Sequence, residues 1–197
     1  MARLNYNRGD SYDSMLPMPY ITIFIFNSEL KTLWIYPPLS FTQQAHAQVL
    51  TYGLQQNPFL ATNLISAYDL CGNPTKSKLV FHSIELKSVY LWNSLINGYV
   101  RNFVYNEAFE LFEKLCNCNV LPDDYTLATV AKFSGKVHLV ARKSVHGKSI
   151  RVGYVLHTVV ANSLMPMYCK CGNFGECRKV FEEMAQRNVG SWNAITA

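Results

Sequence analysis

The chain has 197 residues, 49% of them hydrophobic, and its 18 Lys and Arg against 13 Asp and Glu give a net charge of +5. This length suits one or two compact domains or a short solenoid, and the apolar fraction excludes a wholly disordered chain. The modest positive charge permits an anionic partner, but it is equally consistent with simple solubility.

Residues 1–40 show no helical repeat and are expected to be an irregular or poorly ordered segment. Their most apolar window, Tyr20–Phe26, alternates β-forming residues and is far shorter than the roughly 18 residues that a membrane span needs. Arg3 and Arg8 are accompanied by acidic residues, whereas a transit peptide is poor in acids. The segment therefore offers neither a membrane span nor a clear targeting signal.

From residue 58 onward, apolar side chains recur every three or four residues, which is the period of an amphipathic helix. In 58–88, one apolar stripe precedes the turn Cys71–Asn73 and a second follows it. In 91–123, the two stripes are separated by Asn102–Asn106, and Asn106 is expected to cap the second helix. Both segments therefore predict a helix-turn-helix unit.

Residues 124–157 carry the same pattern less regularly. In 158–188, Pro166 falls inside the expected first helix, at the place of Ser66 in the earlier unit. An interior proline removes one hydrogen bond and clashes with the preceding turn, so this helix is expected to kink or to start late. No strand-turn-strand pattern follows residue 40, and the predicted fold class is all-α.

The chain also repeats itself at a distance of one hundred residues. Residues 46–97 align without a gap on 146–197, with identities at 13 of 52 positions. The matches include the rare strings Cys-Gly-Asn and Trp-Asn. A hundred residues is too long for one solenoid unit, so the period should divide into three helical hairpins.

These strings resemble plant pentatricopeptide repeat proteins, of the subclass that alternates P, L and S repeats. The resemblance implies an α-α solenoid, a right-handed superhelix of tetratricopeptide-like helix-turn-helix repeats. Three of its repeats have 35, 34 and 31 residues, which together give the hundred-residue offset. The resemblance divides the chain into a partial L-like repeat at 41–57, an S-like repeat at 58–88, a P repeat at 89–123, an L-like repeat at 124–157, an S repeat at 158–188 and the start of a truncated P repeat at 189–197.

Members of this family bind single-stranded RNA, and each repeat addresses one base through its fifth and last residues. The resemblance implies these base-reading candidates: Asn93 with Asp123, Asn162 with Asn188, Thr62 with Ser88, and Asn193 alone. It further implies that an Asn–Asp pair favours uracil, that an Asn–Asn pair favours pyrimidines, and that the non-polar Tyr90 and Val159 sandwich the base. The L repeat offers Ala128 and His157, a poor pair because alanine has no polar side-chain atom.

Structural interpretations compete with the base-reading one. Asn93 and Asn193 follow Trp at a helix start, where Asn also serves as a cap, and Asp123 lies at a turn, where Asp is common. Further side chains are expected to pack rather than to bind ligands: Trp92, Trp192, His46 and His146.

No enzyme motif, metal site or cofactor site is expected. Four of the six cysteines form two Cys-x-Cys spacings, the paired Cys-x-x-Cys of a zinc site does not occur, and reduced thiols are expected. The His-x-Glu and Pro-Cys-x-x-Cys strings of zinc deaminases do not occur. Any catalysis is therefore expected from editing or processing factors that act as partners.

The resemblance implies a mitochondrial or chloroplast protein that binds single-stranded organellar RNA in editing, processing or splicing. A helical scaffold for protein–protein interaction and a decayed, non-functional fragment are the alternatives. The abrupt end of the sequence is typical of a fragment or a truncated gene model. With roughly 1–3 kcal/mol per base, three usable repeats predict weak binding, from millimolar to tens of micromolar.

Overall fold

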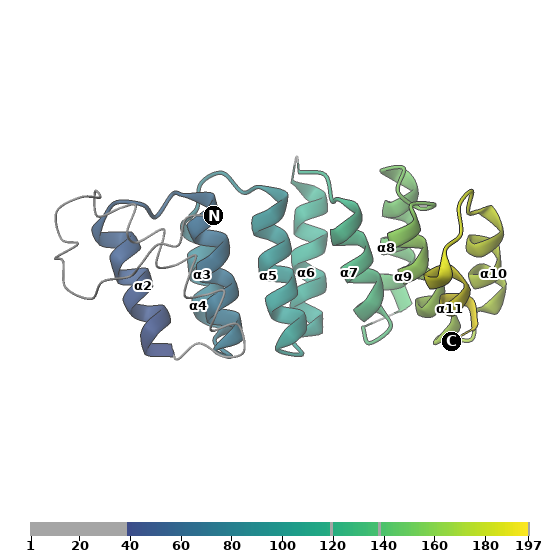
Figure 1. Cartoon of the computed structure of the whole chain (residues 1–197), viewed down its shortest axis with the longest axis horizontal. Coiled ribbons are helices and arrows are strands. Elements are labelled where there is room, and N and C mark those ends of the chain that lie inside the picture. Colours follow the sequence, from purple (N-terminus) through teal and green to yellow (C-terminus); the bar gives the residue numbers. More distant parts are fainter. Residues whose placement is uncertain (1–38, 119, 138, 197) are drawn as a thin grey trace, which may run out of the picture.

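The computed structural model describes residues 39–118, 120–137 and 139–196 of the chain, and these residues form ten helices and no strand. The all-α prediction is confirmed, while residues 1–38 of the expected irregular segment lie outside the described residues. The helices stand side by side in one elongated row (Figure 1). Their bounds are α2 Leu39–Thr51, α3 Pro58–Leu70, α4 Pro74–Ser83, α5 Val89–Arg101, α6 Tyr105–Asn117, α7 Asp124–Ser134, α8 Leu139–Arg151, α9 Thr158–Cys169, α10 Phe174–Glu183 and α11 Val189–Thr196.

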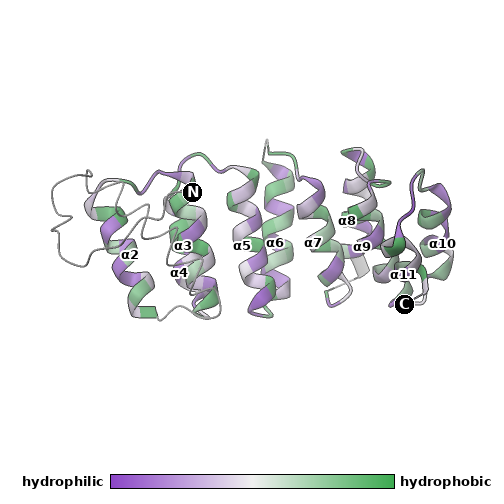
Figure 2. Ribbon diagram, in the orientation of Figure 1, coloured by the Kyte–Doolittle hydropathy of each residue, from purple (hydrophilic) through white to green (hydrophobic). Residues whose placement is uncertain are grey.

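The row has two layers. Helices α3, α5, α7, α9 and α11 form one layer, in which each helix packs against the next. Helices α4, α6, α8 and α10 form the other, and each packs against the helix before it and the helix after it in the chain. Each apolar stripe is therefore buried between neighbouring hairpins, and Figure 2 shows hydrophobic and hydrophilic positions alternating along every helix.

Two core clusters fill the space between the layers. The larger runs without interruption from α2 to α9, and its largest fully buried side chains include Tyr68, Phe81 and Phe112. The smaller joins α9, α10 and α11 through Met165, Phe181 and other residues. This continuous core is the arrangement expected of a solenoid, in which each unit buries its apolar face only against its neighbours.

The hairpin turns follow directly from the Cys-Gly-Asn strings. Gly72 has a φ of +68° and Gly172 a φ of +70°, a left-handed conformation that glycine adopts without a Cβ clash. Asn73 and Asn173 follow these glycines, and their side chains accept a hydrogen bond from the backbone of the next helix. The same three residues thus end one helix and cap the next.

Phe103 occupies the corresponding turn between α5 and α6. It has a φ of +61°, and the Val104 N–H donates to the Tyr99 carbonyl as the Asn73 N–H does to Tyr68. Its ring is 76% exposed, so it contributes little burial to offset this backbone strain.

Phe103→Gly is expected to raise the free energy of unfolding by about 1 kcal/mol, because glycine adopts this backbone conformation freely. Urea denaturation followed by circular dichroism would measure the change. Phe103→Ala keeps the Cβ and is the matched control, with a much smaller expected gain. An equal gain in both variants would attribute the effect to the exposed ring instead of the backbone.

Two local predictions need correction. Asn106 does not cap α6, which begins at Tyr105 after Val104, because the tight turn through Phe103 brings the chain back to helical geometry one residue earlier. Helix α9 does not start late either, since it begins at Thr158 and runs through Pro166. Buried side chains on both sides of the proline, among them Met165 and Met167, hold that stretch against its neighbours, and the expected kink stays a prediction.

The competing packing interpretations hold for several side chains. Trp92 and Trp192 each meet a phenylalanine edge-on, at ring-centre distances of 4.7 and 4.8 Å, although Trp192 remains largely exposed. His46 bonds to the Tyr68 hydroxyl, and His146 bonds likewise to Tyr168. Within the described part of the chain, no cluster of His, Cys, Asp or Glu is placed to hold a metal ion, and no helix is long and apolar enough to cross a membrane.

Candidate nucleic-acid interface

Asn93 and Asp123 meet between α5 and α7. The Asn93 amide nitrogen, Nδ2, donates to both carboxylate oxygens of Asp123, at 3.2 and 3.3 Å. Asn93 lies in the second turn of α5, so it is no helix cap, and it is only 6% exposed. A buried amide needs such partners because an unsatisfied polar group costs about 1–3 kcal/mol.

Asp123 also caps α7, as a turn aspartate is expected to do. Its Oδ1 accepts from the Thr126 N–H at 2.7 Å. The buried Thr126 hydroxyl lies 2.6 Å from both Asp123 Oδ1 and Asn93 Oδ1, and its single proton can serve one of them at a time. Sequence reasoning did not include Thr126 in this site, although its place three residues after a capping Asp was a usable signal.

Asn162 and Asn188 form the corresponding pair between α9 and α11. The Asn162 Nδ2 donates to Asn188 Oδ1 at 3.3 Å, and that oxygen also accepts from the Ser191 N–H at 2.9 Å. The Ser191 hydroxyl bonds to Asn188 rather than to Asn162. Asn162 Oδ1 is therefore buried without a hydrogen-bond partner.

The remaining candidates are not paired in this way. The Thr62 hydroxyl donates to the Pro58 carbonyl, and among the described contacts no hydrogen bond joins Thr62 to Ser88. Asn193 is exposed in α11. Of the last candidate pair, Ala128 is buried, and His157 Nδ1 lies 3.1 Å from Asp124 Oδ2.

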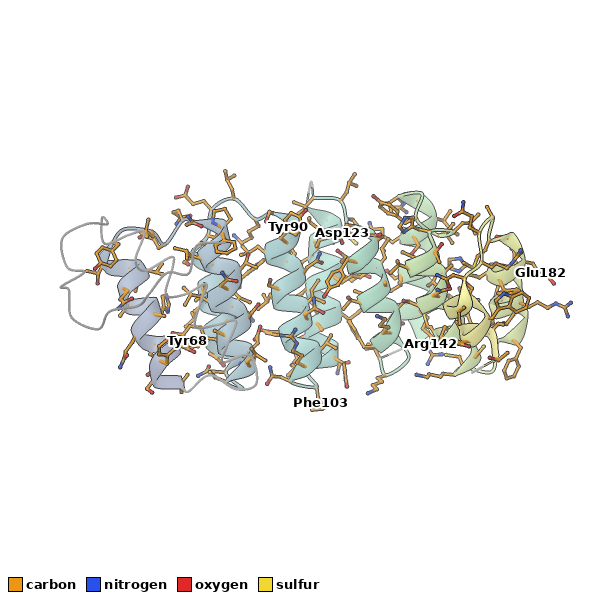
Figure 3. All side chains as sticks on the ribbon, viewed as in Figure 1. Tyr68, Tyr90, Phe103, Asp123, Arg142 and Glu182 are labelled. Atoms are coloured by element: carbon orange, nitrogen blue, oxygen red, sulfur yellow. The ribbon has the colours of Figure 1, made fainter. Side chains whose placement is uncertain are left out.

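Exposed apolar residues precede these pairs by three positions, one helical turn away. Tyr90 is 71% exposed and Val159 is 49% exposed, and Phe59 and Tyr125 occupy the same second position in α3 and α7. In Figure 3, Tyr90 and Asp123 lie at one edge of the helix row and Phe103 lies at the opposite edge. Sequence reasoning named only Tyr90 and Val159, whereas the packed layer places four such side chains at equivalent positions.

One hollow lies beside Asn93 and Asp123, and another lies beside Asn162. A hollow of about 300 Å³ is lined by Asn93, Asp123 and Tyr90, and it extends to the Arg101 side chain at the far end of α5. A second hollow, of about 180 Å³, is lined by Asn162 together with Lys132 and Lys170. Each hollow thus combines an amide with at least one cation, and such a combination can hold a polar, negatively charged ligand.

Comparison with known proteins agrees with this architecture. The profile of the PPR repeat family matches residues 87–132, and the profile of the PPR repeat matches residues 159–189. The chain belongs to the pentatricopeptide repeat family. Proteins of this family are in general RNA-binding proteins of organelles.

The curated relatives are all named as pentatricopeptide repeat proteins. The chain is 36% identical over 153 residues to the pentatricopeptide repeat-containing protein At5g27110 of Arabidopsis thaliana, an alignment that covers 76% of this chain and 22% of that protein. It is 31% identical to At4g35130, named chloroplastic, with 76% and 19% covered. It is 33% identical to At2g03380, named mitochondrial, with 76% and 22% covered; both are also from Arabidopsis thaliana. The chain spans about a fifth of the length of these relatives.

Proposed function

We propose that this chain binds single-stranded RNA along the edge that carries its amide pairs, reading one base with each suitable repeat. The observation that supports this most directly is the contact between Asn93 and Asp123 beside the exposed Tyr90. The second pair, Asn162 with Asn188, repeats this arrangement beside Val159. A base entering between neighbouring repeats would meet an apolar surface and a polar pair together.

The hydrogen-bond inventory of the first pair suits uracil. Asp123 Oδ1 accepts from Thr126, whereas the other carboxylate oxygen, Oδ2, receives only the Asn93 amide. That leaves Oδ2 with acceptor capacity for the N3–H of uracil, which cytosine lacks. In the second pair, the buried Asn162 oxygen is an acceptor without a partner, and an amide pair discriminates less between pyrimidines.

The cations that line the two hollows would meet the phosphates. Arg101 belongs to the first hollow, and Lys132 and Lys170 belong to the second. Three such contacts with a single strand give an expected slope of log affinity against log salt of about −2. A slope near zero would count against a backbone contact by these residues.

We also propose the repeat boundaries, the subclass and the cellular location of the protein. We place the P, L and S repeats at 89–123, 124–157 and 158–188, with further units at 41–57, 58–88 and 189–197. We assign the protein to the subclass with alternating repeats, and to a mitochondrion or chloroplast, where partner factors would supply the chemistry of editing or processing. Two relatives with organellar names support that location.

Asp123→Asn is the sharpest test of base reading, because asparagine keeps the helix cap and reproduces the amide pair of the second site. Titration with two oligonucleotides that differ only in uracil or cytosine at one position should show the preference for uracil fall by about fivefold, which is roughly 1 kcal/mol. Fluorescence anisotropy at several salt concentrations would measure both the preference and the slope.

Asp124→Asn is the matched control, since it removes a neighbouring carboxylate on the same helix without touching the pair. It should leave the base preference unchanged. An identical preference in the wild type, Asp123→Asn and Asp124→Asn would contradict the pairing assignment. If the chain binds no RNA at any salt concentration, a protein–protein scaffold would be favoured instead.

A further inference from the structure

We propose that Cys169 and Cys177 form an oxidisable dithiol that a low-molecular-weight disulfide, such as oxidised glutathione, converts into a covalent staple between α9 and α10. The proposal does not depend on RNA binding. It concerns only the last complete hairpin, α9 with α10, where the two thiols face each other across the helix pair.

The geometry brings these two sulfur atoms together. The Sγ atoms lie 2.8 Å apart, on neighbouring helices that pack along their length. Both are present as thiols, and the described part of the chain places no other cysteine pair in such contact. Cys171, although close in sequence, directs its thiol to the Met167 carbonyl at 2.8 Å.

The earlier S-like unit indicates that the position does not require cysteine for folding. At the hundred-residue offset, Asp69 stands in place of Cys169 and Ser77 in place of Cys177, and Ser77 is fully buried in the same helical position. The site therefore accommodates a serine hydroxyl without loss of the hairpin. Two cysteines in contact at a position that tolerates other residues suggest a chemical role for the pair.

The surroundings set the order of reaction. Cys169 is half-buried and lines an open hollow of about 440 Å³ together with Phe174 and Ile195, so a small reagent can reach it. Cys177 is 2% exposed, and burial together with the neighbouring Cys169 thiol raises the pKa of Cys177 to about 12. The accessible thiol is thus expected to react first, and the buried one to complete the exchange.

The exchange balances in two steps. The Cys169 thiolate attacks one sulfur of the reagent and expels a thiolate, which takes up the proton that Cys169 lost. The Cys177 sulfur then attacks Cys169 Sγ, gives up its own proton and expels the second reagent thiol. Two protein thiols are oxidised to one disulfide, and one reagent disulfide is reduced to two thiols.

The staple would act where the hairpin is weakest. Pro166 lacks an N–H, so the Asn162 carbonyl loses its usual partner within α9. Cys169 ends that helix, and the α9–α10 contacts belong to the smaller of the two core clusters. A covalent link across a loop of about nine residues should raise the melting temperature of the chain by roughly 5 °C.

Incubation of the purified chain with oxidised glutathione, followed by mass spectrometry, tests the proposal. Apart from a glutathione adduct on the exposed Cys118, the protein should lose the mass of two hydrogen atoms, and the new link should join Cys169 to Cys177. Digestion must cut after both Lys170 and Glu176, because only the two cuts together separate the three cysteines of this region. The melting temperature should rise and should return to its initial value on addition of dithiothreitol.

Cys177→Ser carries the residue of the earlier unit and is the decisive variant, while Cys171→Ser is the matched control. The first should retain a glutathione adduct on Cys169 and show no rise in melting temperature, and the second should behave like the wild type. A link through Cys171, or an equal rise in Cys177→Ser, would overturn the proposal. If Cys177→Ser proves too unstable to study, the linkage map of the wild type decides on its own.

Discussion

Gly98→Ala is expected to lower the free energy of unfolding by about 2 kcal/mol, although alanine is the better helix former. Gly98 lies in α5, directly against the Asp69 side chain of α3. A Cβ on Gly98 would lie 1.6 Å from Oδ2 and 2.0 Å from Cγ of Asp69. Because Asp69 is 3% exposed and short, it cannot turn away from this contact, and the two helices would have to separate.

Separation of α3 and α5 would also alter the candidate RNA-binding edge. The Asn102 amide bridges the same two helices, donating to the Asp69 carbonyl at 3.0 Å and to the Gly98 carbonyl at 2.9 Å. The hollow beside Asn93 is lined by α3 and α5 together, so its width depends on this close approach. Gly98→Ala should therefore weaken RNA binding as well as stability.

Two matched variants isolate the clash. Gly147 is an exposed helical glycine in α8 with open space around its Cα, and Gly147→Ala should be neutral or stabilising by up to about 1 kcal/mol. In an Asp69→Ala background, Gly98→Ala should lose most of its cost, as a double-mutant cycle in urea would show. The same cost in both backgrounds would mean that the Asp69 contact is not the cause.

The local part of this fold was predictable from the sequence. Apolar side chains every three or four residues predicted the helix pairs, and Cys71–Asn73 predicted the turn, because both depend on residues close together in the chain. The contact of Gly98 with Asp69 was not predictable in this way. It joins residues on different helices, and it is set by how closely two packed helices approach.

The candidate site was likewise only partly predictable from the sequence. The family resemblance implied the pairs Asn93–Asp123 and Asn162–Asn188, and both pairs lie in hydrogen-bond contact. Thr126 was not predicted as part of the site because its bond to Asn93 spans 33 residues and forms only when α7 packs beside α5. The missing cap at Asn106 has a similar origin, since the turn through Phe103 decided where α6 begins.

The Asp69 carboxyl group makes the stability of the chain depend on pH. Neither of its oxygens receives a hydrogen bond, and the nearby Ser77 hydroxyl donates to the Pro74 carbonyl. Burial raises the pKa of Asp69 to about 7 from an ordinary value of 3.8, while the charge of Arg101 acts in the opposite direction. The folded chain therefore holds this proton more tightly than the unfolded chain, and it disfavours the carboxylate.

Asp69→Asn is accordingly expected to stabilise the chain at pH 8 and to have little effect at pH 4. Below the pKa of Asp69 in the unfolded chain, this carboxyl group is protonated in both the folded and the unfolded wild type. As pH rises from about 4 to 7, Asp69 ionises only in the unfolded state, so the free energy of unfolding falls. Since one pKa unit corresponds to about 1.4 kcal/mol, the full penalty above pH 7 is on the order of 4 kcal/mol, and the amide avoids it. Urea denaturation across this range would measure the difference, with the exposed Glu85→Gln as a control that leaves the pH dependence unchanged. Parallel stability curves for the wild type and Asp69→Asn would show that Asp69 is ionised in the folded chain without cost.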